Sequence, residues 1–177
     1  MGDYLNYIGV GTKNCFILNN TLFENNQMIG AFGETEGEIR LTEHCENNVV
    51  MNNLVYGRDN DVFIHKYTNT GSSNLIDYNY YFAIDGGAWN WEQIQDEHNI
   101  HAFSQWQTLS GQDQHSFYGK DPLFKDVQKP DLNLMEQSTV WDSGHLLEDE
   151  SLYGTYDMNG NARIVNGKIS IGAVQQP

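Results

Sequence analysis

Short apolar stretches separated by polar pairs recur along the first half of the chain. Three segments read as an apolar strand, a polar pair that contains asparagine, and a second apolar strand: residues 15–23, 49–56 and 75–82. Aligning Asn20, Asn53 and Asn79 places these segments 33 and 26 residues apart. Self-similarity at such a spacing indicates a repeat architecture, in which each repeat is one small unit of secondary structure.

A second pattern precedes each of these segments. It covers residues 7–11, 38–42 and 61–65. In each of them apolar residues alternate with other residues, which predicts a strand with one buried face. Ile39 and Leu41 align with Val62 and Ile64 after a shift of 23 residues. One repeat therefore reads as strand, turn, strand, asparagine turn, strand.

This repeat predicts an all-β fold, a right-handed parallel β-helix of about three coils. A single coil cannot bury its own apolar side chains, whereas stacked coils form a continuous core and pair strands about 4.8 Å apart. Asparagine suits the recurrent turn because it tolerates left-handed backbone and its amides hydrogen-bond along a stack, so we expect Asn20, Asn53 and Asn79 to form a ladder. An antiparallel sandwich is the alternative, but Asn-Gly hairpin signals are absent from residues 1–82.

The pattern changes after residue 82. Residues 83–120 show little periodicity, and we interpret them as a long irregular insertion with a short helix near residues 92–99. Residues 121–177 return to short apolar pairs between turns and are expected to supply C-terminal closing strands. Because no low-complexity linker separates these parts, residues 1–177 are interpreted as a single domain, with the β-helix coils in residues 1–82.

Composition and charge narrow the possible functions. The formal net charge of −15 argues against nucleic acid as a partner, because phosphates need Lys and Arg, and argues weakly against an acidic polysaccharide unless a cation mediates. Cys15 and Cys45 lie in apolar surroundings outside any CxxC motif, which favours buried free thiols over a zinc site or a disulfide. No apolar run approaches the ~18 residues of a membrane span. The first residues do not resemble a signal peptide, which favours a C-terminal piece of a longer protein over an intracellular one.

Several motifs follow one another in the second half: residues 103–107 (FSQWQ), 111–116 (GQDQHS), 121–124 (DPLF) with Asp126, 131–134 (DLNL) leading to Ser138 and 142–144 (DSG), 157–164 (DMNGNARI) and 169–173 (ISIGA). In this order they resemble one family, the secreted bacterial and archaeal right-handed parallel β-helix repeat proteins of the pectate-lyase-like superfamily, many of which end in a choice-of-anchor segment. The chain departs from the family near its end. Ser170 stands where an aspartate is usual, and Val174-Gln175 stand where a Tyr-Glu pair is usual.

The resemblance implies a carbohydrate-associated protein, located outside the cell or at its surface. The family includes polysaccharide lyases, glycoside hydrolases and proteins without a known reaction, so the chain could belong to an enzyme. It could equally be a non-catalytic structural or glycan-binding module, or a small oligomeric β-helix protein. Within the motifs, Trp106 is expected to cover the core. Asp113, His115 and Ser116 are expected to satisfy turn backbones rather than to form a catalytic triad, since no spacing orients the histidine between nucleophile and acid.

β-Helix enzymes usually bind substrate along one sheet, which points to the outward residues of the second strand pattern. The shift of 23 residues stacks Glu38 on Asp61, Arg40 on Phe63, and a threonine on His65. A carboxylate pair could serve retaining glycoside hydrolysis, could bind Ca²⁺, or could be a solvated acidic face.

A lyase needs a base and a cation that neutralises the sugar carboxylate. His65 as base, with Arg40 or Lys66 as the cation, is one hypothesis, and ordinary surface ion pairing is the other. Trp89 and Trp91 could offer faces on which a sugar stacks, or they could pack in the core.

The N-terminal coil predicts an oligomer. No capping segment precedes the first strand pattern, and an uncapped coil exposes its apolar interior together with unpaired backbone groups. A second copy related by a twofold axis would cover this end. We therefore expect a homodimer or higher homo-oligomer joined near residues 4–11 and 16–23.

Overall fold

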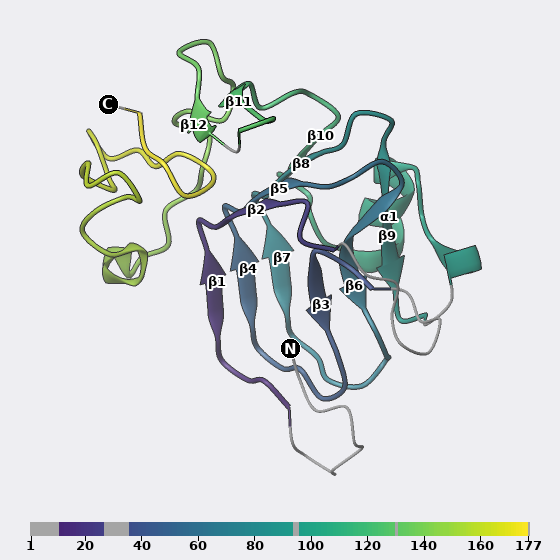
Figure 1. Cartoon of the computed structure of the whole chain (residues 1–177). Helices are drawn as coiled ribbons and strands as arrows, with labels where there is room; N and C mark the ends of the chain where they lie inside the picture. Colours follow the sequence, from purple (N-terminus) through teal and green to yellow (C-terminus); the bar gives the residue numbers. More distant parts are fainter. Residues whose placement is uncertain (1–10, 27–35, 94–95, 130, 177) are drawn as a thin grey trace.

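The computed structural model describes residues 11–26, 36–93, 96–129 and 131–176 (Figure 1). Most strands lie in three parallel sheets. The first sheet orders β1 (Phe16–Leu18), β4 (Val49–Met51) and β7 (Leu75–Asp77). The second orders β2 (Thr21–Phe23), β5 (Leu54–Tyr56), β8 (Tyr80–Phe82) and β10 (Phe117–Tyr118). The third orders β3 (Ile39–Leu41), β6 (Asp61–Lys66) and β9 (Gly87–Trp91). The fold is therefore mostly β, with parallel sheets.

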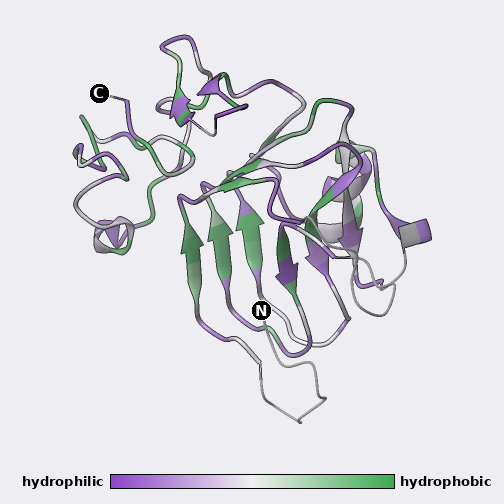
Figure 2. Ribbon diagram, viewed as in Figure 1, coloured by the Kyte–Doolittle hydropathy of each residue, from purple (hydrophilic) through white to green (hydrophobic). Residues whose placement is uncertain are grey.

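Consecutive strands along the chain belong to different sheets. β3, β4 and β5 form one strand triplet and β6, β7 and β8 form the next, so that each triplet gives one strand to every sheet. Ile17, Val50 and Ile76 lie in register across the first sheet. Figure 2 shows β1, β4 and β7 as predominantly hydrophobic strands, which the apolar pattern of the sequence predicts. The strands predicted within residues 15–23, 49–56 and 75–82 are confirmed.

The asparagine ladder is also confirmed. The backbone N–H and the Nδ2 of Asn20 both donate to Oδ1 of Asn53, at 3.0 Å each. Asn53 donates in the same way to Oδ1 of Asn79, at 2.9 and 3.0 Å. Asn53 and Asn79 are fully buried, so these bonds satisfy polar groups that water cannot reach. A second ladder joins the Cys15 N–H to Asn48.

The register predicted for the third sheet is wrong. Ile39 pairs with Ile64 and Arg40 with His65, a shift of 25 residues instead of 23. β6 also has an irregularity toward β9, where Val62 and Ile64 pair with consecutive residues of β9 and Phe63 is the extra residue. Phe63 is fully buried, which breaks the alternation on which the predicted register depends.

The core lies between the sheets and extends under α1 (Phe103–Ser110). Trp106 of this helix is fully buried, which confirms its expected role as a cover of the core. The helix expected near residues 92–99 is reduced to the 3-10 turn η1 (Asp96–His98). α1 itself was not predicted, because its N-cap residue Ala102 makes no side-chain capping bond that a sequence motif would reveal. Cys15 and Cys45 are free thiols, as expected, but only Cys45 is fully buried and Cys15 is partly exposed.

The C-terminal part is less regular than expected. β11 (Phe124–Asp126) and β12 (Asp131–Leu134) form an antiparallel pair, and η2 (Glu150–Tyr153) is a 3-10 turn. The closing strands expected over residues 157–164 and 169–173 are not formed, since these residues take part only in isolated bridges and turns. Side chains satisfy the backbone instead, as where Gln175 Oε1 accepts from the Ser170 N–H at 2.8 Å.

The strands at the two edges of the three parallel sheets have different neighbours. At one end, β10 pairs with β8, Ile100 bridges to Trp89, and the Asp113 N–H donates to the carbonyl of Ile76. At the other end β1, β2 and β3 are the outermost strands of their sheets, and no described strand pairs with their free edges. Of the segments predicted to join two copies, residues 16–23 lie at this end, and residues 4–10 are outside the described part of the chain.

Candidate functional site

Glu38 and Asp61 are brought together by an asparagine rather than by direct stacking. The Asn26 N–H donates to Glu38 Oε1 at 3.0 Å, and Asn26 Nδ2 donates to Asp61 Oδ1 at 2.6 Å. Asn25 Nδ2 donates to the other Glu38 oxygen at 3.1 Å. Asp61 is buried and also accepts from the Val62 N–H at 2.9 Å. Both carboxylates therefore already serve local backbone and amide groups.

The electrostatic environment distinguishes Glu38 within this pair. Burial raises the pKa of the Glu38 carboxyl above its usual range. The hydrogen bonds from Asn26 and Asn25 oppose that effect, and the negative charge of Asp61 reinforces it. A carboxyl whose pKa is raised retains its proton at higher pH, which is the property that a general acid requires.

Arg40 and His65 are neighbours on adjacent strands of the third sheet. The Arg40 guanidinium forms an ion pair with Glu36 at 2.6 Å and lies 4.6 Å from the centre of the Tyr67 ring. His65 is fully buried, and its Nε2 lies 2.8 Å from the Gln93 carbonyl oxygen. Arg40 and Glu38 line a cavity of about 580 Å³ beside β1, β2 and β3, whereas His65 is not among its lining residues. The base and the cation that lyase chemistry would need are therefore not brought to one groove.

Lys66 and Trp89 are interior residues. The Lys66 ammonium donates to the carbonyls of Thr68 and, at 2.9 Å, of Thr70. Burial lowers the pKa of Lys66, and the nearby charge of Glu92 opposes this shift. Trp89 is fully buried and packs against Phe63 and Trp106, so neither face of its ring is open to a ligand.

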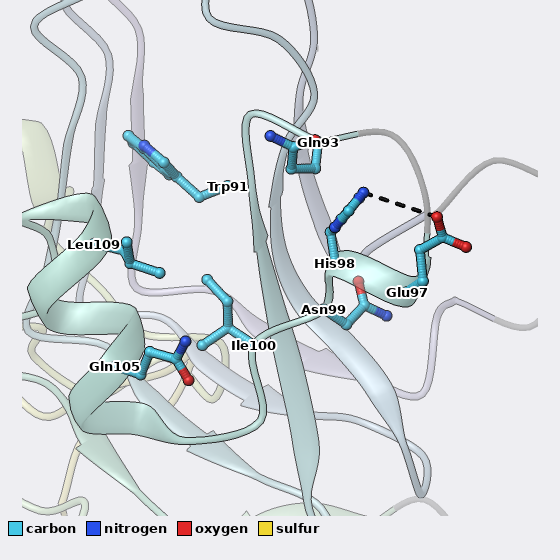
Figure 3. A pocket seen from close by; sticks show the side chains of 8 residues that line it. All are labelled: Trp91, Gln93, Glu97, His98, Asn99, Ile100, Gln105 and Leu109. Atoms are coloured by element: carbon cyan, nitrogen blue, oxygen red, sulfur yellow. Dashed lines mark ion pairs between the residues drawn. The ribbon is translucent and has the colours of Figure 1, made fainter.

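A pocket of about 430 Å³ opens beside the end of β9 (Figure 3). It is lined by Trp91, Gln93, Glu97, His98, Asn99, Ile100, Gln105 and Leu109. In Figure 3 the side chains of Gln105 and Leu109 project from α1, and those of Glu97 and His98 belong to the short turn on the opposite side. The pocket therefore lies between two elements of the 83–120 insertion and the edge of the third sheet.

The lining of this pocket combines apolar surface with amide groups. Trp91 is half-buried, with the edge of Trp106 packed against it at 5.5 Å between ring centres. Gln93 and Gln105 are exposed, and Asn99 is fixed by accepting from Asn90 Nδ2 at 2.8 Å. An aromatic face with neighbouring amides can bind a neutral, polyhydroxylated ligand, since the ring packs on C–H groups while the amides exchange hydrogen bonds with hydroxyls.

Of these lining residues, the sequence pattern singled out Trp91 alone. The amides were missed because they come from separate parts of an aperiodic segment. Their one signal was the abundance of glutamine in residues 83–120.

Asp113 is the most strongly buried carboxyl of the motif segment. Its two oxygens accept from Trp106 Nε1 at 2.8 Å, from the Tyr81 hydroxyl at 3.0 Å, and from Ser116 Oγ. Burial raises its pKa to about 6, although these hydrogen bonds lower it in part. Ser116 Oγ also accepts from the Asn79 N–H at 2.8 Å. The structural role expected of Asp113 and Ser116 is thus seen in their contacts.

His115 has a different environment from these two residues. Its Nδ1 lies 2.7 Å from Asp77 Oδ2, and its ring is exposed. The Tyr78 ring is stacked between His115, at 4.8 Å, and His145, at 4.2 Å. Because aromatic faces occupy both sides of Tyr78, this group connects the C-terminal segment to the sheets rather than offering Tyr78 as a ligand platform.

No group of three or more His, Cys, Asp or Glu side chains suited to a metal ion occurs among the described residues. Within the described ranges no helix has the length and apolar character needed to cross a bilayer, and α1 has only eight residues.

Comparison with known proteins finds similarity to an uncharacterized bacterial protein. The chain is 28% identical over 126 residues to the uncharacterized protein YwoF of Bacillus subtilis (strain 168). The aligned region covers 70% of this chain and 25% of that protein, so the chain spans about a quarter of the length of its relative. No family model matches the chain, and no solved structure matches it.

Proposed function

We propose that this chain is the closing part of a right-handed parallel β-helix of the secreted, carbohydrate-associated kind, and that it binds a neutral glycan in the Trp91 pocket. The distribution of successive strands over three parallel sheets supports the β-helix. Right-handedness follows from the strong preference of parallel crossover connections. The resemblance of residues 101–173 to the family's C-terminal motifs supports an extracellular or cell-surface location.

The observation that carries the glycan proposal is the lining of the pocket. Trp91 supplies a partly open aromatic face, and amides from Gln93, Asn99 and Gln105 surround it. Glu97 adds an acidic group, and the chain carries a net charge of −15, so the pocket favours neutral sugars over uronic acids. We propose binding without a reaction because the side chains predicted to be catalytic are engaged in local contacts. These side chains are Glu38, Arg40, Asp61 and His65.

The test is calorimetric titration of the purified chain with neutral oligosaccharides, such as β-linked glucans and mannans, and with oligogalacturonate. We expect binding of a neutral oligosaccharide with a dissociation constant in the millimolar to micromolar range, about −4 to −8 kcal/mol. Trp91→Ala should abolish binding, and Gln105→Ala should weaken it without affecting folding, because Gln105 is exposed. Tyr156→Ala removes an exposed aromatic ring outside the pocket and serves as the matched control.

Two results would contradict this proposal. Binding that survives Trp91→Ala would place the ligand elsewhere. No binding to any glycan would favour a purely structural module.

Hydrolysis of a glycoside is a second candidate function. It is supported by the raised pKa of Glu38 beside Asp61, which is the combination of an acid and a second carboxylate. Here Glu38 would donate the proton to the leaving oxygen, and Asp61 would act as base or nucleophile. Release of reducing sugar that disappears in both Glu38→Gln and Asp61→Asn would support it, whereas full activity in either variant would remove these residues from the reaction.

A further inference from the structure

A second, smaller pocket lies within the C-terminal segment. Its volume is about 220 Å³, which is below the range of pockets that hold drug-sized ligands. It is lined by Asp142, Val165, Asn166, Lys168, Gln175 and Gln176. None of these residues lines the Trp91 pocket, so the two pockets are separate sites.

Gln175 gives this pocket a buried hydrogen-bond donor that has no acceptor. The residue is 1% exposed, and its Oε1 accepts from the Ser170 N–H at 2.8 Å, which fixes the orientation of the amide. Its Nε2 is buried and finds no hydrogen-bond partner within the described part of the chain. Because a buried donor in this state costs free energy, the amide favours a ligand that brings an acceptor to it.

Lys168 and Asp142 add one charge of each sign to the lining. Nζ of Lys168 lies 3.2 Å from Asp142 Oδ2, and the two side chains are 61% and 33% exposed. An ion pair with this exposure is weak, because water screens it and both side chains lose freedom when they form it. A ligand that carries its own charges can therefore replace this contact at little cost.

The backbone holds these three residues in place. Ser170 is fully buried and contacts two of them, since its N–H donates to Gln175 and its Oγ accepts from the Asp142 N–H at 3.2 Å. Lys168 closes a tight turn, in which its N–H and its carbonyl both pair with Val165 at 3.0 Å. Positions that are fixed in this way need little further ordering when a ligand binds.

The charges and the unpaired donor select among small ligands. A simple cation would pair with Asp142, but Lys168 would repel it and the Gln175 donor would stay unpaired. A simple anion would suit Lys168 and Gln175, but Asp142 and the net charge of −15 oppose it. A neutral polyol could accept from Gln175, but it would gain nothing from the two opposite charges. A zwitterion offers an ammonium to Asp142 and carboxylate oxygens to Lys168 and Gln175.

We propose that this pocket binds a small zwitterion of the α-amino acid type. Its carboxylate would accept from Lys168 Nζ and Gln175 Nε2, and its ammonium would pair with Asp142. The carboxylate would thus supply the acceptor that the Gln175 amide lacks, and the small volume restricts the ligand to short side chains. The proposal does not rest on the glycan site.

The test is an NMR titration of the isotope-labelled whole chain with glycine and with L-alanine. We expect the side-chain amide signals of Gln175 to shift and to saturate, with a dissociation constant of about 0.1–10 mM. Acetate and methylammonium each carry one of the two charges, and glucose is a neutral polyol. These three probes should bind at least about tenfold more weakly than glycine.

Two variants separate the ligand contacts from a structural role. Gln175→Glu keeps the shape and the acceptor for the Ser170 N–H, but it replaces the unpaired donor by a carboxylate oxygen and should abolish glycine binding. If that variant fails to fold, Lys168→Met changes an exposed side chain and should weaken binding at least about tenfold by loss of a charged hydrogen bond. Lys129→Met is the matched control and should bind as the wild type, since Lys129 is an exposed lysine that pairs with Asp126 at 3.7 Å outside the pocket.

Three outcomes would overturn the proposal. Equal binding of acetate and glycine would indicate a simple anion site instead of a zwitterion site. Glycine binding that survives Lys168→Met unchanged would place the ligand elsewhere. An unshifted Gln175 amide at about 100 mM glycine would remove the site, because a ligand of millimolar affinity saturates there. None of these results bears on the glycan proposal, which Trp91→Ala tests with oligosaccharides.

Discussion

The buried carboxyl of Asp113 makes the stability of this protein depend on pH in an unusual direction. Most carboxyls in folded proteins are stabilised in the ionised form, so acid lowers the stability of the folded protein. Asp113 has the opposite balance, because burial raises its pKa from 3.8 to about 6 despite four hydrogen-bonding neighbours. Its proton is therefore held more tightly in the folded state than in the unfolded chain.

The size and sign of the effect follow from these two values. Each tenfold difference in proton affinity is worth about 1.4 kcal/mol, so Asp113 contributes about 3 kcal/mol to the pH dependence of unfolding. That stability is fully present below pH 3.8 and is lost as the pH rises through about 6. At pH 5 about half of it, roughly 1.4 kcal/mol, remains relative to pH 7.5.

The assay is urea unfolding of the wild type and Asp113→Asn at pH 7.5, 6 and 5. The variant has no proton to gain, so the difference in unfolding free energy should widen by about 1.4 kcal/mol between pH 7.5 and 5. Other carboxyls affect both proteins equally. Asp157 is one of them, where hydrogen bonds from Gln175 and Asn161 outweigh burial and lower the pKa. A difference that narrows toward pH 5 would refute the reasoning, because it would mean that the hydrogen bonds to Asp113 outweigh its burial.

Three further predictions concern other contacts. Asn53→Asp should lower the unfolding free energy by roughly 2 kcal/mol or more in urea titration, since it replaces two buried donors by acceptors, while Asn20→Asp at the exposed rung should cost less than about 1 kcal/mol. Tyr78→Ala should cost about 1–3 kcal/mol by loss of two stacked imidazole rings, and Tyr78→Phe should be near wild type. CaCl₂ should leave the Tm unchanged, because both carboxylates of the Asn26-linked pair already accept hydrogen bonds. A Ca²⁺-dependent rise abolished by Asp61→Asn would assign the ion to that pair.

The strands and the ladder could be predicted because their signals are local and repeated. Asn20, Asn53 and Asn79 mark one turn in three successive units, and the apolar stretches flank each of them. The register of β6 could not be predicted in the same way. Val62, Phe63 and Ile64 are all apolar, and shifts of 23 and 25 residues keep the same strand faces in register, so the apolar pattern does not distinguish the pairing of Ile39 with Val62 from the observed pairing with Ile64.

The C-terminal segment misled the prediction for a different reason. The run Ile169-Ser170-Ile171 alternates as a strand does, and both isoleucines are buried. However, the Ser170 N–H is satisfied by Gln175 and the carbonyl of Ser170 by Arg163, so no neighbouring strand is required. The alternation shows only which side chains face the core. Side-chain hydrogen bonds to the backbone can replace the pairing with a neighbouring strand and leave the same side chains buried.

The candidate site shows a similar limit. Trp89 and Trp91 are two residues apart on β9, so the sequence gives them the same face, yet Trp89 is fully buried and Trp91 is half-buried at the strand end. What separates them is the position of α1, whose Trp106 packs against both rings. A long-range contact of this kind has no counterpart in the local pattern, and the pocket beside Trp91 depends on it.

The ladder also explains why the two ends of the molecule need different chemistry. A carboxamide both donates and accepts, so a stack of asparagines has a direction and leaves donors at one end and an acceptor at the other. At the donor end, Ser116 Oγ and the carboxylate of Asp113 accept from Asn79, and an ionised carboxylate is a suitable terminator because it offers no donor of its own. Asn20 leaves the acceptor at the other end, so its complement must be a donor.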